Sequence, residues 1–257
     1  MDKKLKLAIT LTIVLVGLAV IIDMSQEPQL KYPLDQQSKR IIEQTTDEFL
    51  EEKVFDLIWK RTFHWLTFFE SLDGFTVTEG GAGTNVLTGT DLIMTTGALT
   101  TNANEVIKQP AEQGLMTFSR RSNMRAGFLL GQITDQTVYI VVGGLSSGSY
   151  YGFKITNATL YGVVSNGSTE STVTLATLSA STVYTMEARY SPKEKVIFYV
   201  DAVEKGVIQN SVATPIPLAN ETASVRLMDI KITTNADAAK VLQISLFEYL
   251  QHRNVLR

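Results

Sequence analysis

Two carboxylates in the C-terminal half, Glu187 and Asp201, are the residues best placed by sequence for acid–base chemistry. A retaining glycoside hydrolase needs two carboxyl groups about 5–5.5 Å apart, and an inverting enzyme needs about 6.5–9.5 Å. Each of these two acids stands alone on its segment, without the Glu-x-Asp-x-Glu pattern that places two acids on one strand face. We therefore expect Glu187 to pair with a surface Lys or Arg, and we predict no catalytic residue and no enzyme.

Other reactive side chains are scarce. The chain contains no cysteine, which excludes disulfides, thiolate metal sites and thiol nucleophiles. Its two histidines, His64 and His252, lack metal-binding spacing, and no serine lies in a nucleophile elbow. Calcium is an open alternative, with Asp135, Asp201 and Asp229 as candidates, but they do not form a contiguous oxygen-ligand loop. We predict no metal site and no cofactor.

Two small groups of residues could bind a ligand. Arg120 and Arg121, with Arg125, form the one basic cluster, which fits either a solvated strand end or a patch for an acidic glycan or partner. Tyr150 and Tyr151 follow a Gly/Ser loop and could stack on a sugar ring or pack in the core. A formal net charge of -3 and the lack of basic–aromatic clusters argue against nucleic acid as a partner.

The N-terminal segment predicts a membrane anchor over residues 1–24. The uncharged run Leu7 to Ile22 approaches the roughly 20 apolar residues that a spanning helix needs. Lys3, Lys4 and Lys6 before it, and Asp23 after it, orient the rest of the chain outside. A cleaved signal peptide is one alternative, although no Ala-x-Ala pattern follows the run. A buried helix of a soluble assembly is the other.

Residues 25–61 are expected to form a polar stalk followed by an amphipathic helix. Thr45 and Glu48 have the spacing of a capping box. One helical face gathers the apolar residues Leu50, Val54, Leu57 and Ile58. This face can pack against the following domain, or it can oligomerise a stalk.

Residues 62–257 predict a β-sandwich, because short apolar runs alternate with turn clusters at roughly 8–12-residue spacing. Asn166-Gly167 predicts a hairpin with a type I′ turn. In the last strand we expect Leu242, Ile244 and Leu246 to face one way. The expected strands are Thr62–Phe69, Leu115–Arg120, Gly127–Gly131, Thr137–Val142, Leu160–Val164, Thr172–Ala176, Val183–Tyr190, Val196–Val200, Val225–Thr233 and Val241–Leu250.

Four of these segments carry a family resemblance. Tyr151–Ile155, Leu160–Val164, Tyr184–Tyr190 and Val196–Asp201 resemble successive strands of the concanavalin A-like lectin/glucanase superfamily, especially its laminin G-like members and jelly-roll modules of virion and tail proteins. The resemblance implies an all-β, two-sheet antiparallel jelly roll. Many members bind glycans, some hydrolyse them and others are structural. Ala202 stands where the family usually has glycine, so we expect an altered turn after Asp201.

Together these features predict a non-enzymatic, membrane-anchored surface or structural protein of a virion, with its lectin-like domain outside the membrane. The sequence leaves two roles open, glycan or receptor attachment to a host and a purely architectural role in a capsid or spike. The expected partners are the membrane, through Leu7 to Ile22, and other virion or envelope subunits in a homo-oligomer. A carbohydrate-binding protein of a cell envelope is the first alternative, and an anchored glycoside hydrolase or lyase is the second.

Overall fold

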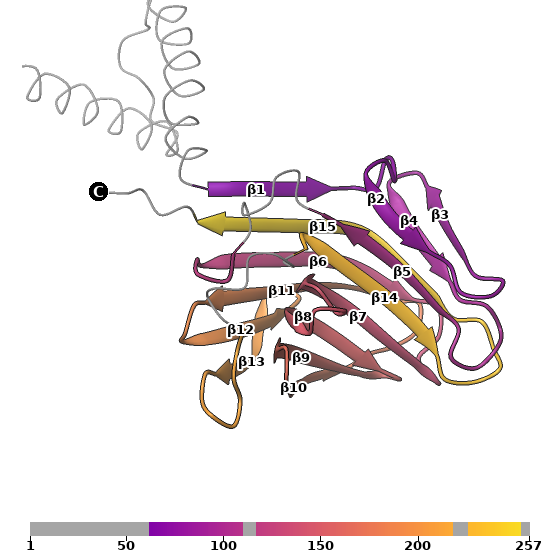
Figure 1. Ribbon diagram of the computed structural model, residues 1–257. Helices are drawn as coiled ribbons and strands as arrows, with labels where there is room; N and C mark the ends of the chain where they lie inside the picture. Colours follow the sequence, from indigo (N-terminus) through magenta and orange to yellow (C-terminus); the bar gives the residue numbers. More distant parts are fainter. Residues whose placement is uncertain (1–61, 110–116, 218–225, 253–257) are drawn as a thin grey trace, which may run out of the picture. The chain divides into compact units, whose positions relative to one another are not determined.

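The computed structural model describes residues 62–109, 117–217 and 226–252, which form a sandwich of two antiparallel β-sheets (Figure 1). All regular elements in these ranges are strands, in agreement with the all-β prediction. No helix in these ranges is long and apolar enough to cross a membrane. The predicted anchor, 1–24, and the predicted stalk with its amphipathic helix, 25–61, lie outside the described residues.

One sheet has eight strands and the other has seven. The eight-stranded sheet runs in the order β13 (Val203–Gln209), β12 (Lys195–Val200), β11 (Val183–Ser191), β6 (Ser122–Leu130), β15 (Val241–His252), β4 (Asp91–Thr95) and β3 (Thr84–Thr88), with β1 (Thr62–Thr67) also paired to β15. The seven-stranded sheet runs β10 (Glu170–Thr177), β9 (Thr159–Asn166), β8 (Ser149–Thr156), β7 (Gln136–Gly143), β14 (Met228–Thr234), β5 (Ala103–Lys108) and β2 (Phe75–Thr78).

Period-two alternation decides which side chains face the core. In β11, Met186, Ala188 and Tyr190 are buried between the sheets, while Glu187 and Arg189 lie on the outer face. This is the division of faces that the sequence predicts for Val183–Tyr190. The same alternation in the neighbouring strands leaves polar side chains along the outer face of the eight-stranded sheet.

Aromatic contacts join the two sheets. The ring of Tyr151 in β8 stacks on that of Tyr190 in β11, with centroids 5.1 Å apart. The Tyr151 hydroxyl is 2.8 Å from the Ser122 hydroxyl, so the buried phenol is satisfied. Gly162 of β9 lies against the ring of Phe198 in β12, where a Cβ would come within 2.6 Å of ring atoms. Glycine at this position therefore permits the close approach of the sheets.

The hairpin predicted at Asn166-Gly167 is present, but its turn is not type I′. Of the two residues only Gly167 has a positive φ, of 94°, whereas type I′ requires positive φ at both central positions. The Asn166 side chain instead accepts hydrogen bonds from the backbone N–H groups of Ser168 and Thr169, at 3.2 and 3.0 Å. This side-chain turn replaces the backbone turn that we expected.

The turn after Asp201 remains tight despite the missing glycine. Asp201 and Ala202 have φ values of 49° and 63° and connect paired residues Val200 and Val203. Two positive φ values in a two-residue loop are those of a type I′ turn. Asp201 Oδ1 accepts the backbone N–H of Thr185 at 2.9 Å. The altered turn predicted from Ala202 is therefore wrong, and the chain holds an alanine in the left-handed region.

Two further strand predictions need correction. Thr117–Arg121 forms no strand, and pairing begins at Ser122, because the Thr117 hydroxyl accepts the Ser119 N–H in a local turn. A β-bulge between Ile244 and Leu246 changes the face of the following residues. Phe247, rather than Leu246, is fully buried. Every predicted strand except Leu115–Arg120 overlaps an observed one.

Candidate functional site

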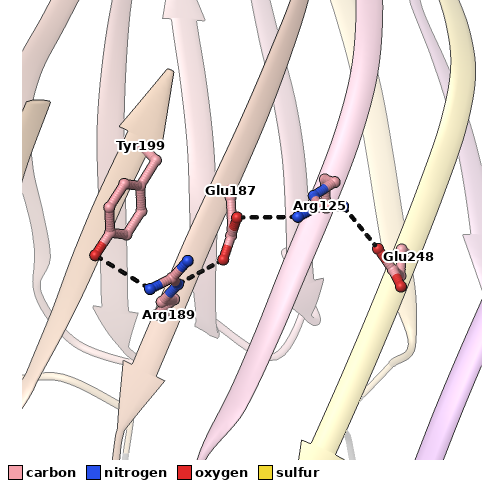
Figure 2. A network of polar contacts seen from close by, with 5 residues as sticks. All are labelled: Arg125, Glu187, Arg189, Tyr199 and Glu248. Carbon is pink, nitrogen blue, oxygen red and sulfur yellow. Dashed lines mark hydrogen bonds and ion pairs between the residues drawn. The ribbon is translucent and has the colours of Figure 1, made fainter. Parts of the chain in front are cut away.

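A row of polar side chains crosses the outer face of the eight-stranded sheet. The register pairs Tyr199 of β12 with Glu187 of β11, Glu187 with Arg125 of β6, and Arg125 with Glu248 of β15. Arg189 lies two residues from Glu187 on the same face of β11. Figure 2 shows these five side chains as one continuous network. The network is thus positioned by four strands, β6, β11, β12 and β15.

Glu187 is the centre of this network. Its Oε1 accepts the Nε–H of Arg189 at 2.5 Å, and its Oε2 accepts an Nη2–H of Arg125 at 3.3 Å. Arg125 also reaches Glu248, with Nη1 to Oε2 at 3.6 Å. Arg189 Nη1 donates to the Tyr199 hydroxyl at 3.4 Å, and its Cζ lies 4.4 Å from the ring centroid. These contacts fix both arginines, and each guanidinium keeps N–H groups that the described contacts do not engage.

The charges of the two arginines keep Glu187 ionised. Partial burial alone would raise its pKa, but hydrogen bonds and charge from Arg189 and Arg125 outweigh burial and lower it. The hydrogen bond to Glu187 raises the pKa of Arg189 further. Side-chain exposure is 47% for Arg125 and 50% for Arg189, against 14% for Glu187. The guanidinium groups are therefore the parts of the network that a ligand would meet.

A second polar cluster lies on the outer face of the seven-stranded sheet. The hydroxyls of Tyr150 and Tyr139 both donate to Glu170 Oε2, at 2.5 and 3.1 Å. Lys154 Nζ donates to Glu170 Oε1 at 2.6 Å and lies 5.2 Å from the Tyr139 ring centroid. Burial, followed by the hydrogen bond to Glu170, raises the pKa of Tyr150. Lys154 and Tyr150 lower the pKa of Glu170 despite its partial burial.

This second cluster caps a small apolar group and presents less free polar surface. Val141 and Val163 point away from the main core yet are completely buried, and Tyr150 packs on them at 7% exposure. Glu170 already accepts three hydrogen bonds, and Lys154 is held by the same carboxylate. The Arg125–Glu187–Arg189 network is therefore the better candidate for binding.

The structure separates the residues that the sequence suggests for ligand binding. Tyr150 and Tyr151 point to opposite faces of β8, and Tyr151 is fully buried in the core, where its ring cannot meet a ligand. Arg120 is half-buried and Arg121 is exposed, both in the turn before β6. Arg125, which follows them on β6, joins Glu187 as an ion pair. The expected pairing of Glu187 with a surface Lys or Arg is confirmed.

Sequence reasoning missed Arg189, Tyr199 and Glu248 as members of one site. Alternation in β11 and β12 does place Arg189 and Tyr199 on outer faces, which is a usable signal. Glu248 gave none, because its neighbour Arg125 lies 123 positions earlier and the two meet only through the β6–β15 register. The Ser245 bulge further obscures the face on which Glu248 lies.

A buried acid lies near the second cluster. Asp229 is 0% exposed, and its Oδ2 accepts from Arg226 Nη1 at 2.6 Å and from the Leu145 N–H at 3.0 Å. Its Oδ1 has no hydrogen-bond donor within the described residues. Burial, with a further contribution from the Glu105 carboxylate, raises the pKa of Asp229 to about 7. The hydrogen bond from the Leu145 N–H and, to a smaller extent, the charge of Arg226 oppose this rise in the pKa.

The three acids considered for calcium are dispersed in the structure. Asp201 caps the Thr185 N–H, Asp229 pairs with Arg226, and Asp135 lies in the turn before β7. Within residues 62–109, 117–217 and 226–252, no group of three or more His, Asp or Glu side chains could hold a metal ion.

Comparisons with known proteins relate the chain to others by fold alone. No protein-family model matches it, and no curated protein matches its sequence. A protein of unknown function from Shewanella oneidensis MR-1 superposes with a TM-score of 0.54 and 17% identity, over 77% of this chain and 89% of that one. The CBM2 module of the evolved Dit of Lactobacillus casei BL23 phage J-1 superposes with a TM-score of 0.54 and 9% identity, over 77% and 99%.

Botulinum neurotoxin type C, whose cell entry depends on interaction with two ganglioside molecules, has a TM-score of 0.51 to this chain and 10% identity. The match covers 79% of this chain and half of the toxin chain. These likenesses establish a β-sandwich fold that the chain shares with modules of phage and toxin proteins.

Proposed function

We propose that this chain is a carbohydrate-binding attachment protein, and that the outer face of the eight-stranded sheet receives the glycan. The observation that carries the proposal is the exposed network of Arg125, Glu187, Arg189 and Tyr199 on one sheet face. Its members lie on regular strands, so their positions are fixed before a ligand arrives.

The chemistry of the network suits a sugar. The Tyr199 ring is partly exposed and Arg189 covers one of its faces, so the group that it offers to a sugar is its hydroxyl, which can donate and accept. Guanidinium N–H groups that remain free can donate to neighbouring hydroxyls, while carboxylate oxygens can accept from them. The fold shared with the CBM2 module of a phage Dit protein supports this proposal.

We propose further that the chain binds without catalysing a reaction. A glycosidase acid works with a raised pKa, whereas the pKa of Glu187 is lowered by its arginine partners. Asp201 Oδ1 accepts a hydrogen bond from the Thr185 N–H. Glu187 is thus unsuited to the role of general acid, and both of its carboxylate oxygens are already engaged by Arg189 and Arg125.

The wider setting of the domain is part of the same proposal. We place it outside a membrane, held by Leu7 to Ile22, on the surface of a virion or a cell envelope, in a homo-oligomer. Membership of the concanavalin A-like superfamily is proposed on the four strand segments quoted above. The phage origin of one structural neighbour favours the virion.

A glycan array tests the binding function. We would apply the full chain, kept in a detergent without a sugar headgroup, together with the Tyr199→Ala variant. As a matched control, Tyr161→Ala removes a half-buried tyrosine from β9 in the other sheet. We expect the wild type and Tyr161→Ala to bind the same glycans and Tyr199→Ala to lose them. Absence of any bound glycan would refute the proposal.

A further inference from the structure

We infer that the ligand of the Arg125–Glu187–Arg189 face is an uncharged saccharide and that the two glutamates exclude anionic glycans. This inference rests on the proposed carbohydrate-binding function and adds the ligand class. It follows from the charges around the network, from the hydrogen-bonding groups left free, and from the protonation state of Glu187.

The network has no net charge. Arg125 and Arg189 contribute two positive charges, while Glu187 and Glu248 contribute two negative charges at distances of 2.5–3.6 Å. A third carboxylate, Glu204 on β13, pairs in register with Tyr199 and acts electrostatically on Arg189. A carboxylate or sulfate that approaches either arginine therefore also approaches a fixed negative charge.

An anion could pair with Arg189 Nε or with the two Nη atoms of Arg125 only by displacing a glutamate. Glu187 and Glu248 already occupy these positions, and strand pairing holds them there. A displaced Glu187, which is only 14% exposed, would lose charge-assisted hydrogen bonds to both arginines. Like charges close together oppose binding and act as a specificity device.

Uncharged hydroxyls meet no such conflict. A guanidinium carries five N–H donors, and the described contacts engage Nη1 and Nη2 of Arg125 and Nε and Nη1 of Arg189. Donors therefore remain on groups that are about half exposed. The Tyr199 hydroxyl accepts from Arg189 and keeps its own proton to donate. Sugar hydroxyls both donate and accept, so they fit an alternation of donors and acceptors.

The negative charge of Glu187 persists at neutral pH. Partial burial would raise the pKa of Glu187, but the two arginines lower it overall, so the carboxylate stays ionised well below neutrality. The hydrogen bond to Glu187 raises the pKa of Arg189, so this arginine keeps its charge as well. Glu187 therefore keeps its negative charge beside the two arginines in a neutral medium.

The test compares matched ligands on the full chain. We would measure the affinity for a neutral oligosaccharide and for its sialylated or sulfated counterpart by titration calorimetry. The wild type should bind the neutral member at least tenfold more tightly. Glu248→Gln, which removes the carboxylate beside Arg125 Nη1 while Arg125 keeps its contact with Glu187, should shift the ratio of anionic to neutral affinity about tenfold toward the anionic member. Glu70→Gln, which removes the same charge from an exposed position after β1, should leave this ratio unchanged.

The outcomes separate the two proposals. Preference of the wild type for the anionic ligand, or a Glu248→Gln variant that behaves like Glu70→Gln, would overturn the neutral-ligand inference while leaving carbohydrate binding intact. If neither ligand class bound the wild-type chain, and circular dichroism showed that this chain was folded, the proposed function itself would be refuted.

Discussion

The guanidinium of Arg189 lies over the ring of Tyr199, with its Cζ 4.4 Å from the ring centroid, while its Nε holds Glu187 at 2.5 Å. A single side chain thus joins the aromatic and the charged halves of the outer face. A cation–π contact at an exposed site contributes about 0.5–1 kcal/mol, and an exposed ion pair about 0–1 kcal/mol. Stability alone gains little from this arrangement.

Arg189→Ala should accordingly lower the free energy of unfolding by no more than about 2 kcal/mol, the upper sum of one exposed cation–π contact and one exposed ion pair. Urea unfolding followed by tryptophan fluorescence would measure it. A loss of about 3 kcal/mol or more would instead mean that the network is a structural support.

Asp229→Asn should change how stability depends on pH. The pKa of Asp229 is about 7 in the folded chain and 3.8 ordinarily, so the folded state binds more protons between these values. The contribution of Asp229 to the free energy of unfolding is therefore complete below about pH 4. It decreases as the pH rises toward 7 and stays constant above that. Asn cannot ionise, so the variant should lack this slope. The free energies of unfolding of the two proteins would be measured in urea at several pH values. The same dependence on pH in both would contradict a raised pKa for Asp229.

Ala202→Gly should stabilise the β12–β13 hairpin. Ala202 has a φ of 63°, in a region that costs an L-residue roughly 1–2 kcal/mol and costs glycine almost nothing. After the greater entropy of glycine in the unfolded chain is subtracted, we expect a gain of about 0.5–1 kcal/mol. Thermal unfolding would detect it as a higher Tm. An unchanged or lower Tm would argue that Ala202 is not strained.

Gly162→Ala should destabilise the sandwich, because its Cβ would lie 2.6 Å from ring atoms of Phe198. Overpacking of this kind costs about 1–3 kcal/mol. Phe198→Leu in the same chain should recover part of the loss, since it removes the ring that clashes. A double-mutant cycle from urea unfolding measures this coupling, and strictly additive effects would show that the two residues do not meet.

Much of the sandwich could be predicted from local pattern. Alternation in Val183–Tyr190 predicted the buried and exposed faces of β11, and turn residues marked the hairpin around Asn166. The bulge before Leu246 left no sequence signal, because no special residue is needed there. The left-handed Ala202 was equally hidden, since the surrounding strand pairing imposes a conformation that alanine does not favour.

The candidate site depends on strand order, which local pattern does not contain. Glu187 could be expected to pair with some basic residue, but the choice of Arg125 follows from β6 lying beside β11. The burial of Tyr151 depends on its stacking partner Tyr190 across the sandwich. Long-range register, rather than residue type, therefore decided which predicted ligand residues reached the surface.

Titration calorimetry of wild-type chain and Arg189→Ala, with the tightest neutral glycan from the array, tests the central claim most directly. The account predicts that the variant keeps its fold and weakens binding at least tenfold, which corresponds to about 1.4 kcal/mol. Equal affinities for the two proteins would contradict it and would place the ligand elsewhere on the molecule.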